Sequence, residues 1–319
     1  MIQMSLSRTR PHLYDPRLGT EAIRIDDLVG GTKAIEPPRT NYFSIYWIEA
    51  GNGEFWADAT RCAFSPASLL FFIPYQYIRI VPTAAVHGSL IQFHANFLCV
   101  ETFHAESGCA GSLFNDAYQP PVVALNKTSQ RDVANIFKRM QDEQRTRSLA
   151  FEEMLLAQLK VLLIMATRLK AKSTEACSAG GLNPRHPALA PLKELIDAQF
   201  TKLHAPSDYA KLLHMSPKTL GRVVREQLGK SLTDLIRERI LTHAKWQLLH
   251  TLKPIKEVAR EVGFTDELYF SRMFKKATGH SPTFFRDFET EIRGGSNLSM
   301  LSSPAPILAR SHAADNSGS

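Results

Sequence analysis

Cysteine is scarce in this sequence, and its few cysteines show no disulfide or metal-binding pattern. The 319 residues include 4 cysteines, none in a Cys-x-x-Cys pair, whereas a small disulfide scaffold needs a far higher density. Long apolar runs are also missing, because even the most apolar stretch, 155–169, is interrupted by polar and charged side chains. No basic and then apolar leader is found near the N-terminus. These absences predict a protein of a reducing cytoplasm that is neither secreted nor inserted in a membrane.

Positive charge is present in excess, and most of it lies in one third of the chain. The net charge is +7. Residues 184–293 hold 19 lysines and arginines against 13 aspartates and glutamates, which is a net charge of +6. A local excess of this kind indicates a polyanionic partner, because phosphates attract it and release counterions on binding. A basic surface that serves only solubility is the alternative.

Turn residues and hydrophobic periodicity divide the chain into two parts. From 42 to about 98, short aromatic and β-branched runs alternate with glycine and proline, which is typical of a β-sandwich or small barrel. Two helices are expected near 130–145 and 149–171. We expect a β-barrel domain with helices over 1–172, a linker over 173–187, an all-helical domain over 188–290 and a disordered tail over 291–319. The predicted fold class is therefore α+β.

Two segments of the helical part have the pattern of a helix-turn-helix unit. Each has a short helix with a small alanine, Ala210 or Ala259, then a turn, then a second helix that begins at a capping residue, Ser216 or Asp266. The two units are offset by 49 residues at the alanines and by 50 in the second helices, so the second turn is one residue longer. The second helix of such a unit enters a DNA major groove, where base edges differ in donors and acceptors. A long helix, 231–249, is expected between the units.

The second unit continues into a specific signature. The stretch Ile255–Arg286, IKEVAREVGFTDELYFSRMFKKATGHSPTFFR, resembles the AraC/XylS-type family of transcriptional regulators. The resemblance covers roughly residues 189–288. It implies two helix-turn-helix units joined by a long helix, which read asymmetric promoter sites. In the first unit, His214 replaces the usual turn glycine and Gly221 removes a side chain from the reading helix. We therefore expect the first unit to depend more on phosphate contact and DNA shape.

Position in the motif assigns two sets of residues. The side chains expected to contact DNA are those of Lys218, Thr219, Arg222, Glu267, Leu268, Ser271 and Arg272. The residues expected to build the two units are Ala210, Ser216, Leu220, Ala259, Gly263, Phe264, Asp266, Phe270, Phe274, Gly279, Pro282 and Arg286.

The N-terminal part resembles, more weakly, the sensor and dimerisation domains of the same family, which are cupin-like barrels followed by helices. The resemblance implies control by a small-molecule effector of unknown identity. Trp47, Phe55 and His94 are interpreted as lining its pocket, although aromatic residues on strands more often belong to a core. A regulator without an effector, controlled by its abundance, is the alternative.

Motifs for catalysis and metal binding are absent. A metal-dependent cupin enzyme needs two histidines one residue apart, and no His-x-His occurs. No cysteine has the proline and histidine flanks of an alkyl-transfer DNA-repair protein, and nucleophile elbows and phosphate-binding loops are missing. We predict no enzyme activity, no catalytic residue and no cofactor. The residues His94, Cys99, His104 and Cys109 recur every five positions, which leaves a thiol or metal sensor open, but this spacing matches no standard site and no metal is predicted.

An apolar stripe follows one face of the helix expected at 149–171. Its residues are Phe151, Leu155, Leu159, Leu162, Ala166 and Leu169. The stripe packs on the barrel or on a second copy of the chain, and its width favours both. The expected partners are double-stranded promoter DNA, RNA polymerase, an effector and a second copy bound through the N-terminal domain, with no membrane. The sequence thus predicts a cytoplasmic, sequence-specific regulator of transcription.

Overall fold

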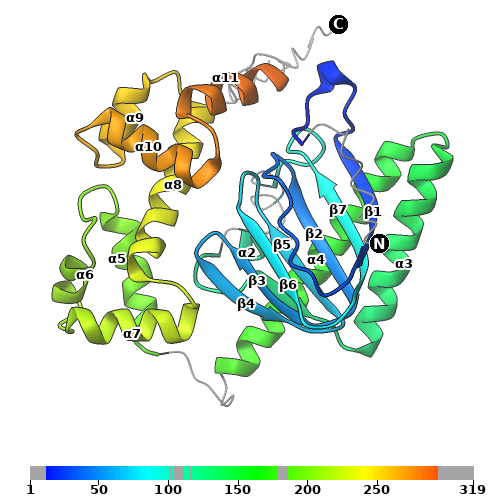
Figure 1. Ribbon diagram of the computed structural model, residues 1–319, viewed down its shortest axis with the longest axis horizontal. Helices are drawn as coiled ribbons and strands as arrows, with labels where there is room; N and C mark the ends of the chain where they lie inside the picture. Colours follow the sequence, from blue (N-terminus) through cyan, green and yellow to red (C-terminus); the bar gives the residue numbers. More distant parts are fainter. Residues whose placement is uncertain (1–11, 101–102, 104–110, 115, 179–185, 294–319) are drawn as a thin grey trace, which may run out of the picture.

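The N-terminal part is built on two antiparallel sheets. The computed structural model describes residues 12–100, 103, 111–114, 116–178 and 186–293 (Figure 1). The strands are β1 (Ile23–Gly30), β2 (Phe43–Ala50), β3 (Gly53–Ala57), β4 (Thr60–Phe64), β5 (Ser68–Phe72), β6 (Ile78–Pro82), β7 (Val86–Phe93) and β8 (Val122–Ala124). Five of them pair in the order β1-β7-β2-β5-β8, and three in the order β4-β3-β6. The described strands therefore form two open sheets and not one closed barrel, while the predicted α+β class is confirmed.

Side chains alternate between two cores along the central strands. On β2, Ile45 and Trp47 belong to a core on the helical side of the five-stranded sheet. Tyr46 and Ile48 belong to a second core between the two sheets. Successive side chains of a strand point to opposite faces, so a sheet covered on both faces becomes apolar throughout. The space between the sheets is filled by large side chains, among them Phe55, and leaves little room for a ligand inside the sandwich.

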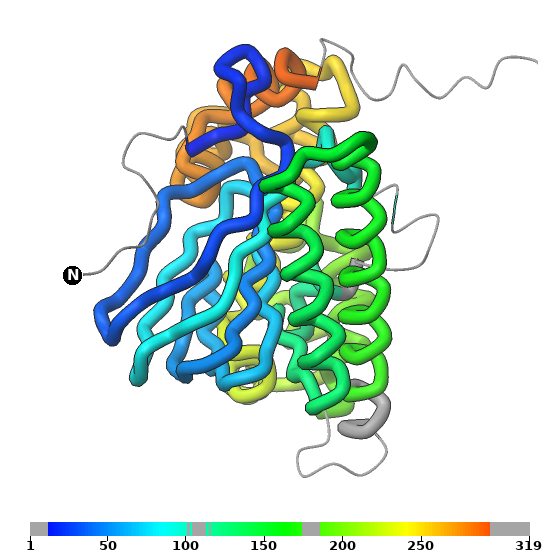
Figure 2. Tube along the Cα trace, turned by 90° about the vertical axis from the view of Figure 1, so that its right-hand side faces the viewer, coloured from blue at the N-terminus to red at the C-terminus, as the bar shows by residue number. Residues whose placement is uncertain are grey.

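Two long helices cover the outer face of the five-stranded sheet. Figure 2 shows α3 (Lys127–Thr146) and α4 (Phe151–Ser178) side by side against it. The side chain of Asn126 begins α3 by accepting the backbone N–H of Ser129 at 2.9 Å. The buried residues of the α4 stripe pack on the sheet, whereas Met154 and Val161 on its other side are exposed. Helix α4 continues into the segment expected as a linker.

The described C-terminal part is entirely helical, and its helices share a second core to which Tyr75 of the N-terminal part also belongs. Its helices are α5 (Leu189–Gln199), α6 (Pro206–Leu212), α7 (Pro217–Leu228), α8 (Leu232–His250), α9 (Ile255–Glu261), α10 (Glu267–Thr278) and α11 (Pro282–Ile292). Helix α8 runs between a group formed by α5–α7 and a group formed by α9–α11 (Figure 1). The remaining described elements are the short helices η1 (Pro16–Leu18) and α2 (Gly111–Phe114). Within the described parts of the chain, no helix is long and apolar enough to cross a membrane.

Candidate nucleic-acid interface

The first helix-turn-helix unit consists of α6 and α7. The hydroxyl of Ser216 accepts the backbone N–H of Thr219 at 3.0 Å, and Pro217 follows at the first helical position. Both features favour a helix start, because the hydroxyl satisfies a free N–H and proline has none to satisfy. In the turn, His214 has φ 53°, so it adopts the left-handed conformation that the usual glycine would supply. Ala210 is fully buried where α6 crosses the rest of the unit.

The second unit consists of α9 and α10. One carboxylate oxygen of Asp266 accepts the backbone N–H groups of Leu268 at 2.7 Å and Tyr269 at 3.2 Å, which fixes the start of α10. The turn residue Gly263 has φ 87°, and a Cβ there would lie 2.2 Å from the carbonyl oxygen of Thr201. Only glycine fits this position, because it combines a left-handed backbone with the close approach of another segment. Phe264 is half-buried beside the ring of His204.

The two reading helices have the same length and begin and end in the same way. Helices α7 and α10 each have 12 residues, offset by 50 positions. Each ends at a left-handed glycine, Gly229 or Gly279, and a serine two residues later caps the next helix. The inward side of both is apolar and buried, with Leu220 at the position equivalent to Phe270. One structural repeat therefore presents two helices in the same way.

The outward sides carry the residues expected to contact DNA. The exposed ones are Lys218, Thr219, Arg222, Leu268 and Arg272, while Glu267 and Ser271 are half-buried. The Nε of Arg272 donates to the carbonyl oxygen of Leu268 at 3.3 Å, so its side chain lies along the exposed face of α10. Sequence reasoning overlooked Tyr269, which is exposed on α10, although its position is equivalent to that of Thr219.

Helix α8 connects the two units as a rigid spacer. Its start has a reciprocal cap, in which Ser231 and Asp234 each bond the backbone N–H of the other. At 1.5 Å per residue its 19 residues span about 28 Å. This length is close to the ~34 Å between successive major grooves on one face of DNA.

Most of the residues expected to build the units lie at their structural positions. Ala259, Phe270 and Phe274 are buried, and Pro282 is the first residue of α11. The Nε of Arg286 donates to the carbonyl oxygen of Leu248 at 3.3 Å and so ties α11 to α8. Burial lowers the pKa of this guanidinium from its ordinary value.

The residues expected around an effector are not brought together. Trp47 packs against Phe137 in the core beneath the helices, and Phe55 lies in the core between the sheets. His94 lies instead at the boundary between the two parts of the molecule. The predicted sensor spacing cannot be compared, since His104 and Cys109 lie outside the described residues. No group of three or more potential metal ligands occurs among the residues that the structure does describe.

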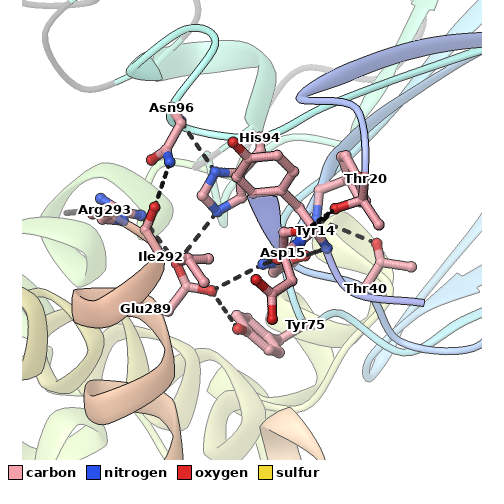
Figure 3. A network of polar contacts seen from close by, with 12 residues as sticks. Tyr14, Asp15, Thr20, Thr40, Tyr75, His94, Asn96, Glu289, Ile292 and Arg293 are labelled. Atoms are coloured by element: carbon pink, nitrogen blue, oxygen red, sulfur yellow. Dashed lines mark hydrogen bonds and ion pairs between the residues drawn. The ribbon is translucent and has the colours of Figure 1, made fainter. Parts of the chain in front are cut away.

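A buried polar network joins the N-terminal domain to α11 (Figure 3). Its centre is Glu289, whose carboxylate accepts the hydroxyl of Tyr75 and the amide of Asn41 and contacts His94 Nε2 at 3.4 Å and Arg293 Nη2 at 3.3 Å. Burial alone would raise the pKa of the Glu289 carboxyl. The hydrogen bond and charge of His94, the charge of Arg293 and the hydrogen bond from Tyr75 together outweigh burial, so the pKa of Glu289 is lowered. The network therefore stabilises the ionised carboxylate.

The ends of both reading helices also touch the N-terminal domain. The guanidinium of Arg39 donates to the carbonyl oxygens of Ala277 and Lys276 at the C-terminal end of α10, where a cation is favoured by the helix dipole. At the equivalent end of α7, a Cβ on Gly229 would lie 2.8 Å from the carbonyl oxygen of Arg61 on β4. The N-terminal domain is therefore in contact with both units at the same structural position.

A cavity of about 1230 Å³ lies between the domains. One wall comes from the N-terminal domain, including Phe71 and Tyr77, and the other from α8 and α10. Among its lining residues are Arg272 of the reading helix and, on α8, Glu238 and Lys245. Burial raises the pKa of Glu238 and lowers that of Lys245. This cavity is somewhat larger than the ~300–1,000 Å³ of most small-molecule sites, so it has room for such a ligand.

Comparison with known proteins agrees with the helical part of this geometry. Residues 209–287 match the helix-turn-helix domain family, so the chain carries a DNA-binding helix-turn-helix domain. More narrowly, this C-terminal domain belongs to the AraC/XylS-type family. The chain is 47% identical over 72 residues to the arabinose operon regulatory protein of Escherichia coli (strain K12), a match that covers 23% of this chain and 25% of that protein.

Two further relatives share the same region. The bifunctional transcriptional activator/DNA repair enzyme AdaA of Bacillus subtilis (strain 168) is 34% identical over 95 residues, which are 30% of this chain and 45% of that protein. The C-terminal domain of AraT, a response regulator from Geobacillus stearothermophilus, is 33% identical and has a TM-score of 0.31, with 33% of this chain and 88% of that one covered. The chain thus spans less than half the length of the two curated relatives it matches here.

Proposed function

We propose that this protein is a sequence-specific DNA-binding regulator of transcription that acts in the cytoplasm. The observation that carries the proposal is the pair of equivalent reading helices, each capped, each with an outward arginine, and joined by α8, a helix about 28 Å long. Promoter DNA is the partner that fits this arrangement and the local excess of positive charge. RNA polymerase is the further partner that we expect, because a transcriptional activator would need to contact it.

The test is selection of bound duplexes from a random library by the full chain. Two half-sites whose centres lie about one helical turn apart are expected, because both helices are presented in the same way along one spacer. Recovery of only unspecific, salt-sensitive binding would contradict the proposal, since phosphate contacts alone give affinity without sequence preference.

We infer that a small-molecule effector controls the protein from the cavity between the domains. The large side chains that fill the sandwich support this position over a pocket around Phe55. A ligand there would contact both domains, and any difference in its affinity for docked and undocked states would shift the population between them. A polar ligand is favoured, because the wall contains the desolvated Glu238 and Lys245.

A metabolite screen by thermal shift separates this effector from control by abundance alone. A ligand that stabilises the full chain should lose its effect in Lys245→Met, which alters the cavity wall. The exposed Lys211→Met should keep it. A stabilising ligand that is unaffected by Lys245→Met would place the effector elsewhere, and a screen without any ligand would favour control by abundance.

We also propose that a second copy of the chain binds the exposed side of α4. Met154 and Val161 lie seven residues apart, so they share one helical face, and the buried stripe beside this face already packs on the sheet. Sedimentation of the full chain should reveal a dimer, and Val161→Glu should shift it to the monomer. A dimer of unchanged strength in this variant would exclude α4 as its interface.

The comparison with AdaA raises enzymatic DNA repair as a second function. None of the four cysteines has the proline and histidine flanks of an alkyl-transfer repair protein, and burial raises the pKa of the Cys62 thiol to about 11, which disfavours the thiolate that would act as a nucleophile at this position. We propose that the chain has no alkyl-transfer activity, which failure to accept an alkyl group from methylated DNA would support.

A further inference from the structure

The two reading helices present different side chains at several equivalent positions, and the second residue of each helix differs most in its chemistry. Lys218 and Leu268 are the second residues of α7 and α10, whereas the outward arginine four residues later is the same in both, as Arg222 and Arg272. The caps before these helices and the glycines after them are also equivalent. The side chains at 218 and 268 are therefore presented to DNA in the same way but with different chemistry.

Leu268 is unusually open for a large apolar residue. Its relative exposure is 70%, and Asp266 fixes the backbone from which it projects by accepting its N–H at 2.7 Å. The N-terminal domain leaves it open, and Leu268 is not among the α10 residues that line the cavity between the domains, which are Tyr269, Arg272, Met273, Lys276, Ala277 and Thr278. Leu268 lies beside this set, and so is free to contact another molecule.

Base chemistry identifies the group that an apolar side chain can read here. In the major groove the N-terminal part of a reading helix meets the base edges. Thymine alone among the four bases presents a methyl group there, whereas a lysine or arginine is matched by the O6 and N7 acceptors of guanine. We propose that Leu268 contacts the 5-methyl group of one thymine in the second half-site, at the base pair equivalent to the one faced by Lys218 in the first.

This inference rests on the proposed DNA-binding function and makes it more specific. The two half-sites should share the base contacted by Arg222 and Arg272. They should differ at the neighbouring base, with thymine required only where Leu268 lies. The inference concerns this one base pair, because the helices also differ at other positions, such as Thr219 and Tyr269.

The experiment uses the full chain and a duplex selected from a random library. Each thymine of the second half-site is replaced in turn by deoxyuridine, which removes only the methyl group, and binding is measured by fluorescence anisotropy. At one position the wild-type affinity should fall about 4-fold, the effect of one methyl group left unburied. In Leu268→Ala the same replacement should have no effect, while replacements elsewhere act as in the wild type.

Two further variants complete the test. Leu268→Lys, selected again on the random library, should change the preferred base at this position from thymine to guanine. Leu252→Ala removes a leucine of similar exposure from the loop before α9 and should behave as the wild type throughout. All of these variants change exposed side chains, so the fold is retained.

The outcomes distinguish this inference from the proposed function. A selected motif that is insensitive to deoxyuridine, or equally sensitive in Leu268→Ala, would overturn the role of Leu268 and leave the regulator intact. A library that yields no motif would overturn both.

Discussion

Replacing Glu289 by alanine should loosen the contact between the N-terminal domain and α11. Glu289 is 2% exposed, and its carboxylate has four polar neighbours. Three of them, Asn41, Tyr75 and His94, come from the other domain. Removing one member of a buried charged network leaves the others without a partner, which typically costs about 3–5 kcal/mol. We expect a loss of this size in the free energy of domain docking.

Thermal unfolding and hydrogen exchange would measure this loss. The melting temperature should fall, and amides beside Tyr75 and at the end of α10 should exchange faster, because both segments are held at this boundary. Glu291→Ala is the matched control, since this residue lies on the same helix with a side chain that is 61% exposed in an ion pair with Arg17. Equal melting temperatures and exchange in the two variants would refute the assigned role of Glu289.

The same network predicts a dependence on pH. The pKa of Glu289 is lower in the folded protein than the ~4.3 of a free glutamate, so ionisation favours the docked state. Its contribution is complete above that value and is lost as the pH falls through the lowered pKa. The stability difference between the wild type and Glu289→Gln should therefore shrink in acid, below about pH 4.3. A difference that grows on acidification would contradict this reasoning.

The remaining predictions concern the helix-turn-helix units. Arg272→Ala should weaken specific binding by about 1–3 kcal/mol and relax the preference at one or two base pairs, whereas Arg237→Ala, on the exposed side of α8, should not change the selected motif. Gly263→Ala should cost about 2 kcal/mol or more in unfolding, because a left-handed, crowded position cannot hold a Cβ. In contrast, Gly221→Ala, which meets nothing within 4 Å inside α7, should stabilise the protein by about 0.5–1 kcal/mol. Asp266→Ala should lose about 0.5–2 kcal/mol as an N-cap, measured by denaturant unfolding, and Asp266→Asn should retain most of the stability.

The helical half could be predicted from sequence because its signals are local. A serine or aspartate cap acts on an N–H two or three residues away, as at Ser216 and Asp266, and the apolar period of a helix spans only a few residues. The left-handed backbone at His214 also follows from the repeat, because the other unit has Gly263 at the equivalent place. Such features are visible without knowledge of distant contacts.

The N-terminal half and the boundary between the domains depend on distant contacts. Whether Trp47 lines a pocket or fills a core depends on which sheet face it occupies and on the helix that covers this face. The contact between His94 and Glu289 joins residues 195 positions apart, and no local pattern relates them. Arg39 lies in an irregular segment whose sequence does not indicate that it binds the end of α10.

Helix α8 has a mechanical consequence for the whole assembly. One of its sides, with Ile236 and Ile240, belongs to the helical core, and another, with Thr242 and Lys245, forms a wall of the cavity. Because α8 is a single rigid helix, a tilt of its middle part moves both of its ends at the same time. A molecule bound against α8 would therefore move both helix-turn-helix units at once, and the contacts of the two units with DNA should change together.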